Sequence, residues 1–185
     1  MSFNQFTKVV VTELETSLNK LDDTSCERAV TMITAADKVF VLGLGRLGLM
    51  LKALAMRLMH MGKEVYVVGE TITPNYGPHD LLIIGSASGE TKQLTQIAEK
   101  AKTLGGSVLA ITGSPGSTIT GIADTSVVVP APSKNQTESE FASAQPMASL
   151  FEQGVLLLGD SLVLALMAAS TKDNSQMFTK HANLE

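Results

Sequence analysis

The sequence predicts a three-layer α/β sandwich built on a five-stranded parallel sheet. Short strand-like runs alternate with helical segments from residue 38 onward. Each run is apolar throughout, which is typical of parallel strands whose two faces are both covered by helices. The connections are long enough for helical crossovers, and such crossovers form right-handed βαβ units. Two further helices are expected before the first strand.

The two leading helices follow from apolar spacing and from capping residues. Phe3 to Leu21 places apolar side chains at the intervals of an amphipathic helix. Asp23 or Thr24 can cap a second helix, which is expected to continue to about Ala36. Residues 1–36 are therefore expected to form an N-terminal helical segment.

The remaining elements alternate along the chain. The expected strands and helices, in order, are Lys38–Leu42, a helix over Arg46–Met61 that ends at Gly62, Val65–Val68, Asp80–Ile84, a helix over Thr91–Leu104, Ser107–Thr112 and Ser126–Val129. The polar segment from Pro130 to Gln145 is expected to be a loop. Pro146 fits the first turn of a last helix that reaches about Ser170.

Length and composition favour one domain in a reducing compartment. We expect a single domain over residues 1–185, with helices in 1–36, an α/β core in 37–170 and a tail in 171–185. Charged residues make up 17% of the chain, below the usual ~25%, which indicates extra buried surface such as a subunit interface. The single Cys26 excludes an intrachain disulfide, and with the absence of a signal pattern it indicates the cytoplasm.

Several partners and ligands are not expected. The net charge is −4 and aromatic residues are few, so no nucleic acid is expected as a partner. The most apolar stretch, Val155 to Ser170, contains Gly159 and Asp160 and is too short and interrupted for a membrane span. The three histidines are too scattered to predict a metal site.

The turn Gly85-Ser86-Ala87-Ser88-Gly89-Glu90-Thr91 is the most informative part of the chain. It follows an apolar run and precedes a helical segment. Backbone N–H groups in the first turn of a helix are free, and the helix dipole favours negative charge there. Hydroxyls of Ser86, Ser88 and Thr91 can add hydrogen bonds. Because the turn contains no lysine, it predicts a site for a small phosphate ester rather than for a nucleoside triphosphate.

A second glycine turn lies after the first predicted strand. Gly43-Leu44-Gly45-Arg46-Leu47-Gly48 matches the pattern G-x-G-x-x-G, and Glu70 lies where a ribose-binding acid would lie in a dinucleotide fold. That fold does not explain the hydroxyl-rich turn. Two glycine turns at the carboxyl ends of neighbouring strands are better explained by one pocket at a topological switch point. The helix dipole disfavours a cation such as Arg46 in the first turn of a helix. Arg46 therefore either faces an anion in this pocket or is solvated.

Longer motifs resemble the 6-phospho-3-hexuloisomerases of the sugar isomerase (SIS) domain family. They are Gly43–Gly48, Ala55–His60, Gly69–Pro74, Ser86–Thr91, Pro146–Glu152 and His181–Glu185. The resemblance runs from about Val39 to the last residue. It implies a flavodoxin-like sheet, interconversion of 3-hexulose 6-phosphate and fructose 6-phosphate, no cofactor, and a homodimer or homotetramer with shared sites.

The resemblance also implies roles for particular residues. Glu152, in an apolar context at the start of the last helix, is the candidate base, and His60 and His181 are further catalytic candidates. The residues expected to bind substrate are Gly45, Arg46, Ser86, Ala87, Ser88, Gly89, Glu90 and Thr91. Asp160 is either a second carboxylate in the pocket or a solvated acid.

Two positions depart from the family pattern, and they leave the substrate open. Leu47 replaces a usual serine, and Ala87 replaces a usual glycine that a positive φ would require. The chain is thus expected to be a keto isomerase of this or another sugar phosphate. A non-catalytic regulator that binds a sugar phosphate and a small dinucleotide-binding module are the alternatives.

Overall fold

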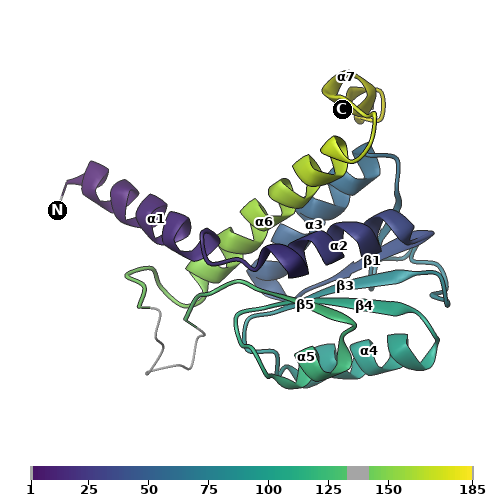
Figure 1. Cartoon of the computed structure of the whole chain (residues 1–185), viewed down its shortest axis with the longest axis horizontal. Coiled ribbons are helices and arrows are strands. Elements are labelled where there is room, and N and C mark those ends of the chain that lie inside the picture. Colours follow the sequence, from purple (N-terminus) through teal and green to yellow (C-terminus); the bar gives the residue numbers. More distant parts are fainter. Residues whose placement is uncertain (1, 133–141, 185) are drawn as a thin grey trace.

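The computed structural model describes residues 2–132 and 142–184 and shows a sheet between two layers of helices (Figure 1). The elements are α1 (Phe3–Leu18), α2 (Asp23–Ala35), β1 (Lys38–Leu42), α3 (Gly45–His60), β2 (Glu64–Val67), β3 (Leu81–Ser86), α4 (Lys92–Thr103), β4 (Ser107–Thr112), α5 (Thr118–Ile122), β5 (Thr125–Val128), α6 (Ser149–Ala168) and α7 (Asn174–Phe178). The predicted fold class is confirmed.

The five strands form one parallel sheet in the order β2-β1-β3-β4-β5. β1 pairs with both β2 and β3, with Val39 opposite Val65 on one side and Leu81 on the other. From β1 the chain crosses toward β2, whereas from β3 it crosses toward β4. The loops that follow β1 and β3 therefore diverge, and the crevice between them is the switch point where ligands bind in such sheets.

Alternating strand residues supply two separate cores. Val41, Ile83 and Ile111 face α2, α3 and α6. Their chain neighbours Leu42 and Ile84 face α4 and α5. Figure 1 shows these two groups of helices on opposite sides of the sheet. Because both faces are covered, the strands carry no polar face, which explains their uninterrupted apolar sequence.

Most predicted boundaries are close to the observed ones, but two helices were missed. α5 and α7 are each five residues long, too short to show a helical apolar period. α1 ends at Leu18 rather than Leu21. Residues 133–141 of the predicted loop lie outside the described residues.

α6 is the core helix of the fold, although its composition would also suit a membrane. Its 20 residues have a mean hydropathy of 1.6 over the most apolar window, and 56% of that window is buried. Length alone therefore does not exclude a span, contrary to the expectation from the sequence. The helix packs against α3, α1 and α2, and these contacts explain its apolar character.

α1 holds the segment that leads into α6. The Glu13 carboxylate accepts hydrogen bonds from the Ser143 hydroxyl at 2.7 Å, the Ala144 N–H at 2.7 Å and the Gln145 side-chain amide at 3.0 Å. Although burial alone would raise it, these three donors lower the pKa of Glu13. The N-terminal end of α6 is thus anchored from outside the sheet.

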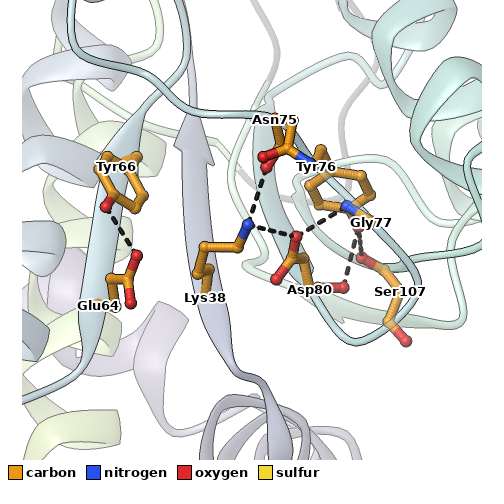
Figure 2. Close-up of polar contacts among 8 residues, drawn as sticks. All are labelled: Lys38, Glu64, Tyr66, Asn75, Tyr76, Gly77, Asp80 and Ser107. Carbon is orange, nitrogen blue, oxygen red and sulfur yellow. Dashed lines mark hydrogen bonds and ion pairs between the residues drawn. The ribbon is translucent and has the colours of Figure 1, made fainter.

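A cluster of polar side chains lies at the amino ends of β1, β3 and β4, at the end of the sheet opposite to the crevice (Figure 2). Lys38 bonds the Asn75 carbonyl at 2.9 Å and lies 3.3 Å from the buried Asp80 carboxylate. The Tyr76 hydroxyl donates to the Ser107 carbonyl at 2.6 Å and contacts the Asp80 carbonyl at 3.1 Å. Burial raises the pKa of Tyr76, so its hydroxyl remains a donor. The cluster fixes the β2–β3 connection where it enters β3.

Tyr76→Phe should therefore lower the free energy of unfolding by about 1–2 kcal/mol, because the Ser107 carbonyl loses the hydroxyl that donates to it. Urea denaturation of both variants would measure this. Tyr66→Phe is the matched control, since the Tyr66 hydroxyl bonds only the exposed Glu64 carboxylate, at 2.7 Å, and little change is expected. Equal losses in the two variants would contradict the role of the Tyr76 hydroxyl.

Candidate active site

A cavity of about 250 Å³ lies at the switch point between β1 and β3. Its lining comes from the N-terminal ends of three helices and from the carboxyl end of β3. The lining residues are Leu44, Leu47, Gly85, Ser86, Ala87, Ser88, Thr91, Leu94, Ala148, Phe151 and Glu152. Each helix directs unpaired N–H groups and the positive end of its dipole toward its N-terminus. The cavity is therefore suited to an anionic ligand.

The Ser86–Thr91 turn forms one wall of this cavity, as the sequence predicts. The Ser86 hydroxyl accepts the Gly89 N–H at 3.1 Å and lies 3.4 Å from the Thr91 hydroxyl. Thr91 is the N-cap of α4, and its side chain makes no capping hydrogen bond. The Leu94 N–H bonds the Thr91 carbonyl at 2.9 Å, so the N–H groups left for a ligand are those of Lys92 and Gln93 at the start of α4. We refer to residues 86–91 as the cradle.

The left-handed residue of the cradle is Gly89, not Ala87. Gly89 has a φ of +68°, whereas Ala87 is absent from the positive-φ residues among those described. The expectation that position 87 requires glycine for its backbone is therefore wrong. The Ala87 carbonyl instead accepts the Gly113 N–H and the Ser114 hydroxyl, each at 3.1 Å.

Glu152, which also lines the cavity, forms an ion pair with Arg46. Arg46 Nη1 lies 2.6 Å from Glu152 Oε2. The carboxylate is buried and the Arg46 side chain is about half exposed. Arg46 thus faces an anion, which is one of the two readings its position allowed. Glu152 also lies in the first turn of α6, where the helix dipole favours a carboxylate.

His60 and His181 lie together, but far from Glu152 in the same chain. Their rings stack with centroids 5.6 Å apart, in a second cavity lined also by Arg57 and Phe178. Arg46 and His60 mark opposite ends of α3, about 21 Å apart along its axis. One substrate cannot contact both Glu152 and His60 of one chain.

The surroundings of His60 favour the neutral form of its ring. His60 is buried, and this burial, the Arg57 charge and His181 lower the pKa of His60. The folded pKa is below the unfolded one, so the neutral ring stabilises the fold above about pH 6.5 and this contribution is lost as pH falls. Asp160 lines this second cavity and is exposed. It is therefore not a second carboxylate beside Glu152.

Not every residue expected to bind substrate lines the first cavity. Ser86, Ala87, Ser88 and Thr91 do, whereas Gly45, Arg46, Gly89 and Glu90 are not among its lining residues. No pattern in the sequence indicates that the Glu90 side chain bonds Thr118 at the start of α5.

Leu47 lies at the base of the cavity. Its side chain is 7% exposed, and its Cδ2 lies 3.2 Å from the point where a Cβ on Gly85 would be placed. Gly85 therefore provides the space that Leu47 occupies. Where the resemblance expects a hydroxyl, the cavity has an apolar floor.

Two other kinds of site find little support. Within residues 2–132 and 142–184, no three His, Cys, Asp or Glu side chains gather as metal ligands. Glu70, the candidate ribose-binding acid, pairs with Lys52 at 3.0 Å on the surface.

The fold and the cavity define a doubly wound α/β domain with its candidate ligand site at the switch point. The SIS domain model matches residues 32–156 of this chain. The chain belongs to the SIS domain family, as its motifs indicated.

Relatives match the chain over nearly its whole length. A 3-hexulose-6-phosphate isomerase from Bacillus subtilis is 42% identical over 185 residues, with 100% of both chains covered. Another from Mycobacterium gastri is 37% identical and covers 94% of this chain and 86% of its own. A hypothetical protein from Methanococcus jannaschii, whose crystal structure led to the inference of a 3-hexulose-6-phosphate isomerase function, has a TM-score of 0.85 at 30% identity. The match covers 98% of this chain and 99% of that one.

Gly89→Ala should disrupt the cradle for two reasons. A Cβ at this left-handed residue is strained, and it would lie 2.0 Å from the Ser117 hydroxyl oxygen. We expect a lower melting temperature and at least about tenfold weaker binding of inorganic phosphate. Calorimetric titration and thermal melting would measure both.

Gly116→Ala is the matched control. Gly116 has a similar φ of +75°, but no atom lies within 4 Å of its Cβ position. Strain alone should cost about 1–2 kcal/mol and leave phosphate binding intact. Equal phosphate affinity in the two variants would show that the contact between Gly89 and Ser117 does not shape the cradle.

Proposed function

We propose that the protein is a keto isomerase that interconverts 3-hexulose 6-phosphate and fructose 6-phosphate through an enediol. The observation that carries this proposal is the placement of an anion cradle and a buried carboxylate, Glu152, on one small cavity. Relatives named for this activity, at 42% and 37% identity, support the choice of substrate.

The two ends of the cavity suit the two ends of a sugar phosphate. The hydroxyls of Ser86, Ser88 and Thr91 and the first turn of α4 bind the phosphate. The sugar carbons then extend toward Glu152 and Arg46. Shape and charge thus orient the substrate before any bond changes.

Proton transfer is the whole of the chemistry. Glu152 takes the proton from C2 of 3-hexulose 6-phosphate, and the carbonyl oxygen on C3 gains a proton, which gives the 2,3-enediol. A proton then returns to C3, and the hydroxyl on C2 loses its proton to become the new carbonyl. Arg46 orients the carboxylate and polarises the oxygens. Since electrons only move within the substrate, the reaction needs no redox cofactor.

His60 and His181 serve a site only across a subunit boundary. The distance along α3 separates them from Glu152 of their own chain. Large apolar side chains remain exposed on three helices: Phe3, Phe6 and Val11 on α1, Leu49, Met56 and Met59 on α3, and Leu157 and Leu164 on α6. A homodimer or homotetramer would bury them and bring one chain's histidines to its partner's cavity.

The remaining assignments follow from the same proposal. The whole chain, residues 1–185, acts as one domain in the cytoplasm, where its free Cys26 stays reduced. A non-catalytic sugar-phosphate sensor is the second candidate, because the ion pair with Arg46 neutralises the charge of Glu152. Fructose 6-phosphate that raises the melting temperature without any turnover would favour the sensor.

Glu152→Gln should lower kcat/KM by about 100- to 10,000-fold, because it removes the base and keeps its size. Formation of fructose 6-phosphate can be followed by conversion to glucose 6-phosphate and a dehydrogenase-coupled absorbance change. Glu99→Gln, on the exposed face of α4, is the control and should retain full activity. Unchanged turnover in Glu152→Gln would exclude this residue as the base.

Mixed oligomers test whether the sites are shared. His60→Asn and Glu152→Gln should each be inactive alone. After denaturation and refolding together, a random dimer with shared sites should regain about a quarter of wild-type activity, since half of the dimers carry one intact site. Suppose that the mixed oligomers have normal size, that His60→Asn alone is inactive, and that the mixture still shows no activity. This result would indicate that each chain uses its own histidine. An active His60→Asn variant would remove His60 from the mechanism.

A further inference from the structure

Glu90 has an unusual pair of hydrogen bonds behind the cradle. Its Oε1 accepts the Thr118 N–H at 2.8 Å, and its Oε2 accepts the Thr118 hydroxyl at 2.6 Å. Both carboxylate oxygens are thus held by one residue, at the first position of α5. The side-chain and backbone hydrogen bonds from Thr118 lower the pKa of Glu90. The carboxylate points away from the cavity lining.

Three further contacts join the cradle to the chain between β4 and α5. The Gly89 carbonyl accepts the Ile119 N–H at 3.1 Å. The Ala87 carbonyl accepts the Gly113 N–H at the same distance. Gly89 also packs directly on Ser117, with no space for a Cβ. The cradle is therefore supported by Gly113, Ser117 and Ile119.

The charge of Glu90 makes its direction important. It lies one residue before the N-cap of α4, close to the N–H groups that would bind a phosphate. A free carboxylate at this point would repel a phosphate ester and could itself accept the N–H groups of the helix. Two donors from Thr118 hold it instead, and neither Glu90 nor Thr118 is among the residues that line the cavity.

We propose that Glu90 is a positioning residue, which holds the cradle in its phosphate-binding shape through Thr118 and does not contact the ligand. The pair of hydrogen bonds is called the Glu90–Thr118 brace below. The brace shapes the backbone N–H groups of residues 86–91, and Thr118 keeps the Glu90 charge out of the site. The sugar phosphate as ligand rests on the proposed function, but the brace itself can be tested with inorganic phosphate.

Four variants separate the two parts of the brace. Glu90→Ala removes both the hydrogen bonds and the charge, whereas Glu90→Gln can keep both hydrogen bonds. Thr118→Pro removes both donors but leaves the carboxylate free. Proline is well suited to the first position of a helix, and the preceding Ser117 is already extended, with ψ of 166°. The double variant Glu90→Ala/Thr118→Pro has neither the donors nor the charge.

Calorimetric titration with inorganic phosphate should rank these variants. Glu90→Ala should bind phosphate about tenfold more weakly than wild type, and Glu90→Gln should remain close to wild type. Thr118→Pro should bind more weakly than Glu90→Ala, because the released carboxylate competes with phosphate. The double variant should recover to the level of Glu90→Ala. Glu99→Ala, which removes the same charge from the exposed face of α4, should bind as wild type does.

Kinetic measurements distinguish a role of Glu90 in positioning the cradle from a role in the stability of the fold alone. In the isomerase assay, Glu90→Ala should raise KM for the sugar phosphate by a similar factor with kcat nearly unchanged. A lower melting temperature and lower kcat at unchanged KM would overturn the proposal. So would wild-type phosphate affinity in Glu90→Ala, additive losses in the double variant, or a wild-type protein that binds no phosphate.

The outcomes also distinguish the brace from the isomerase assignment. If wild-type protein turns over no 3-hexulose 6-phosphate but the phosphate affinities follow the expected order, the brace stands and the isomerase assignment fails. If all variants keep wild-type KM and phosphate affinity, the isomerase assignment stands and the brace fails.

Discussion

The meeting of three helix N-termini at one edge of the sheet is the constraint on which the site depends. A parallel sheet directs every following helix away from its carboxyl edge, so the free N–H groups of α3 and α4 face the same crevice. α6 enters from the far end of the chain and adds a third positive end. Without an anion, this arrangement would leave partial positive charges facing one another. Glu152 supplies one negative charge, and a bound phosphate would supply the other.

Arg46 is explained by this balance. A cation in the first turn of α3 opposes the helix dipole, but here it bonds the buried carboxylate of α6 at 2.6 Å. The pair ties the two helices together at the cavity, while Leu54 and Gly159 pack further along the same interface. The Glu152 carboxylate is thereby fixed to both helices. Under the proposed function, a substrate that engages Arg46 would release this carboxylate toward the sugar carbons.

The fold was predictable from sequence because its strands are buried on both faces, so that runs such as Leu81–Ile84 have no polar interruptions. The cradle was predictable because a hydroxyl-rich glycine turn before a helix has few other uses. The directions of the side chains in the cradle could not be predicted from the sequence. Glu90 and Ser88 look alike as polar cradle residues, and only the position of α5, a single turn without a sequence period, separates them. Likewise, Ala87 needs no positive φ because Gly89 takes it.

The separation of Glu152 from the two histidines has a structural meaning of its own. α3 and α6 are packed along much of their length, so no hinge within the chain can bring His60 to the first cavity. The second cavity contains a stack of three rings. The His181 ring centroid lies 5.8 Å from that of Phe178 and 5.6 Å from that of His60. The short α7 is thus held against the end of α3 by rings that are partly open to solvent. Met177 of α7 is buried in the core shared with α3 and α6, and the Lys172 ammonium bonds the Met61 carbonyl. The sharing of sites proposed above would require a second chain to approach the open side of these rings, where His181 is exposed and His60 is buried behind it.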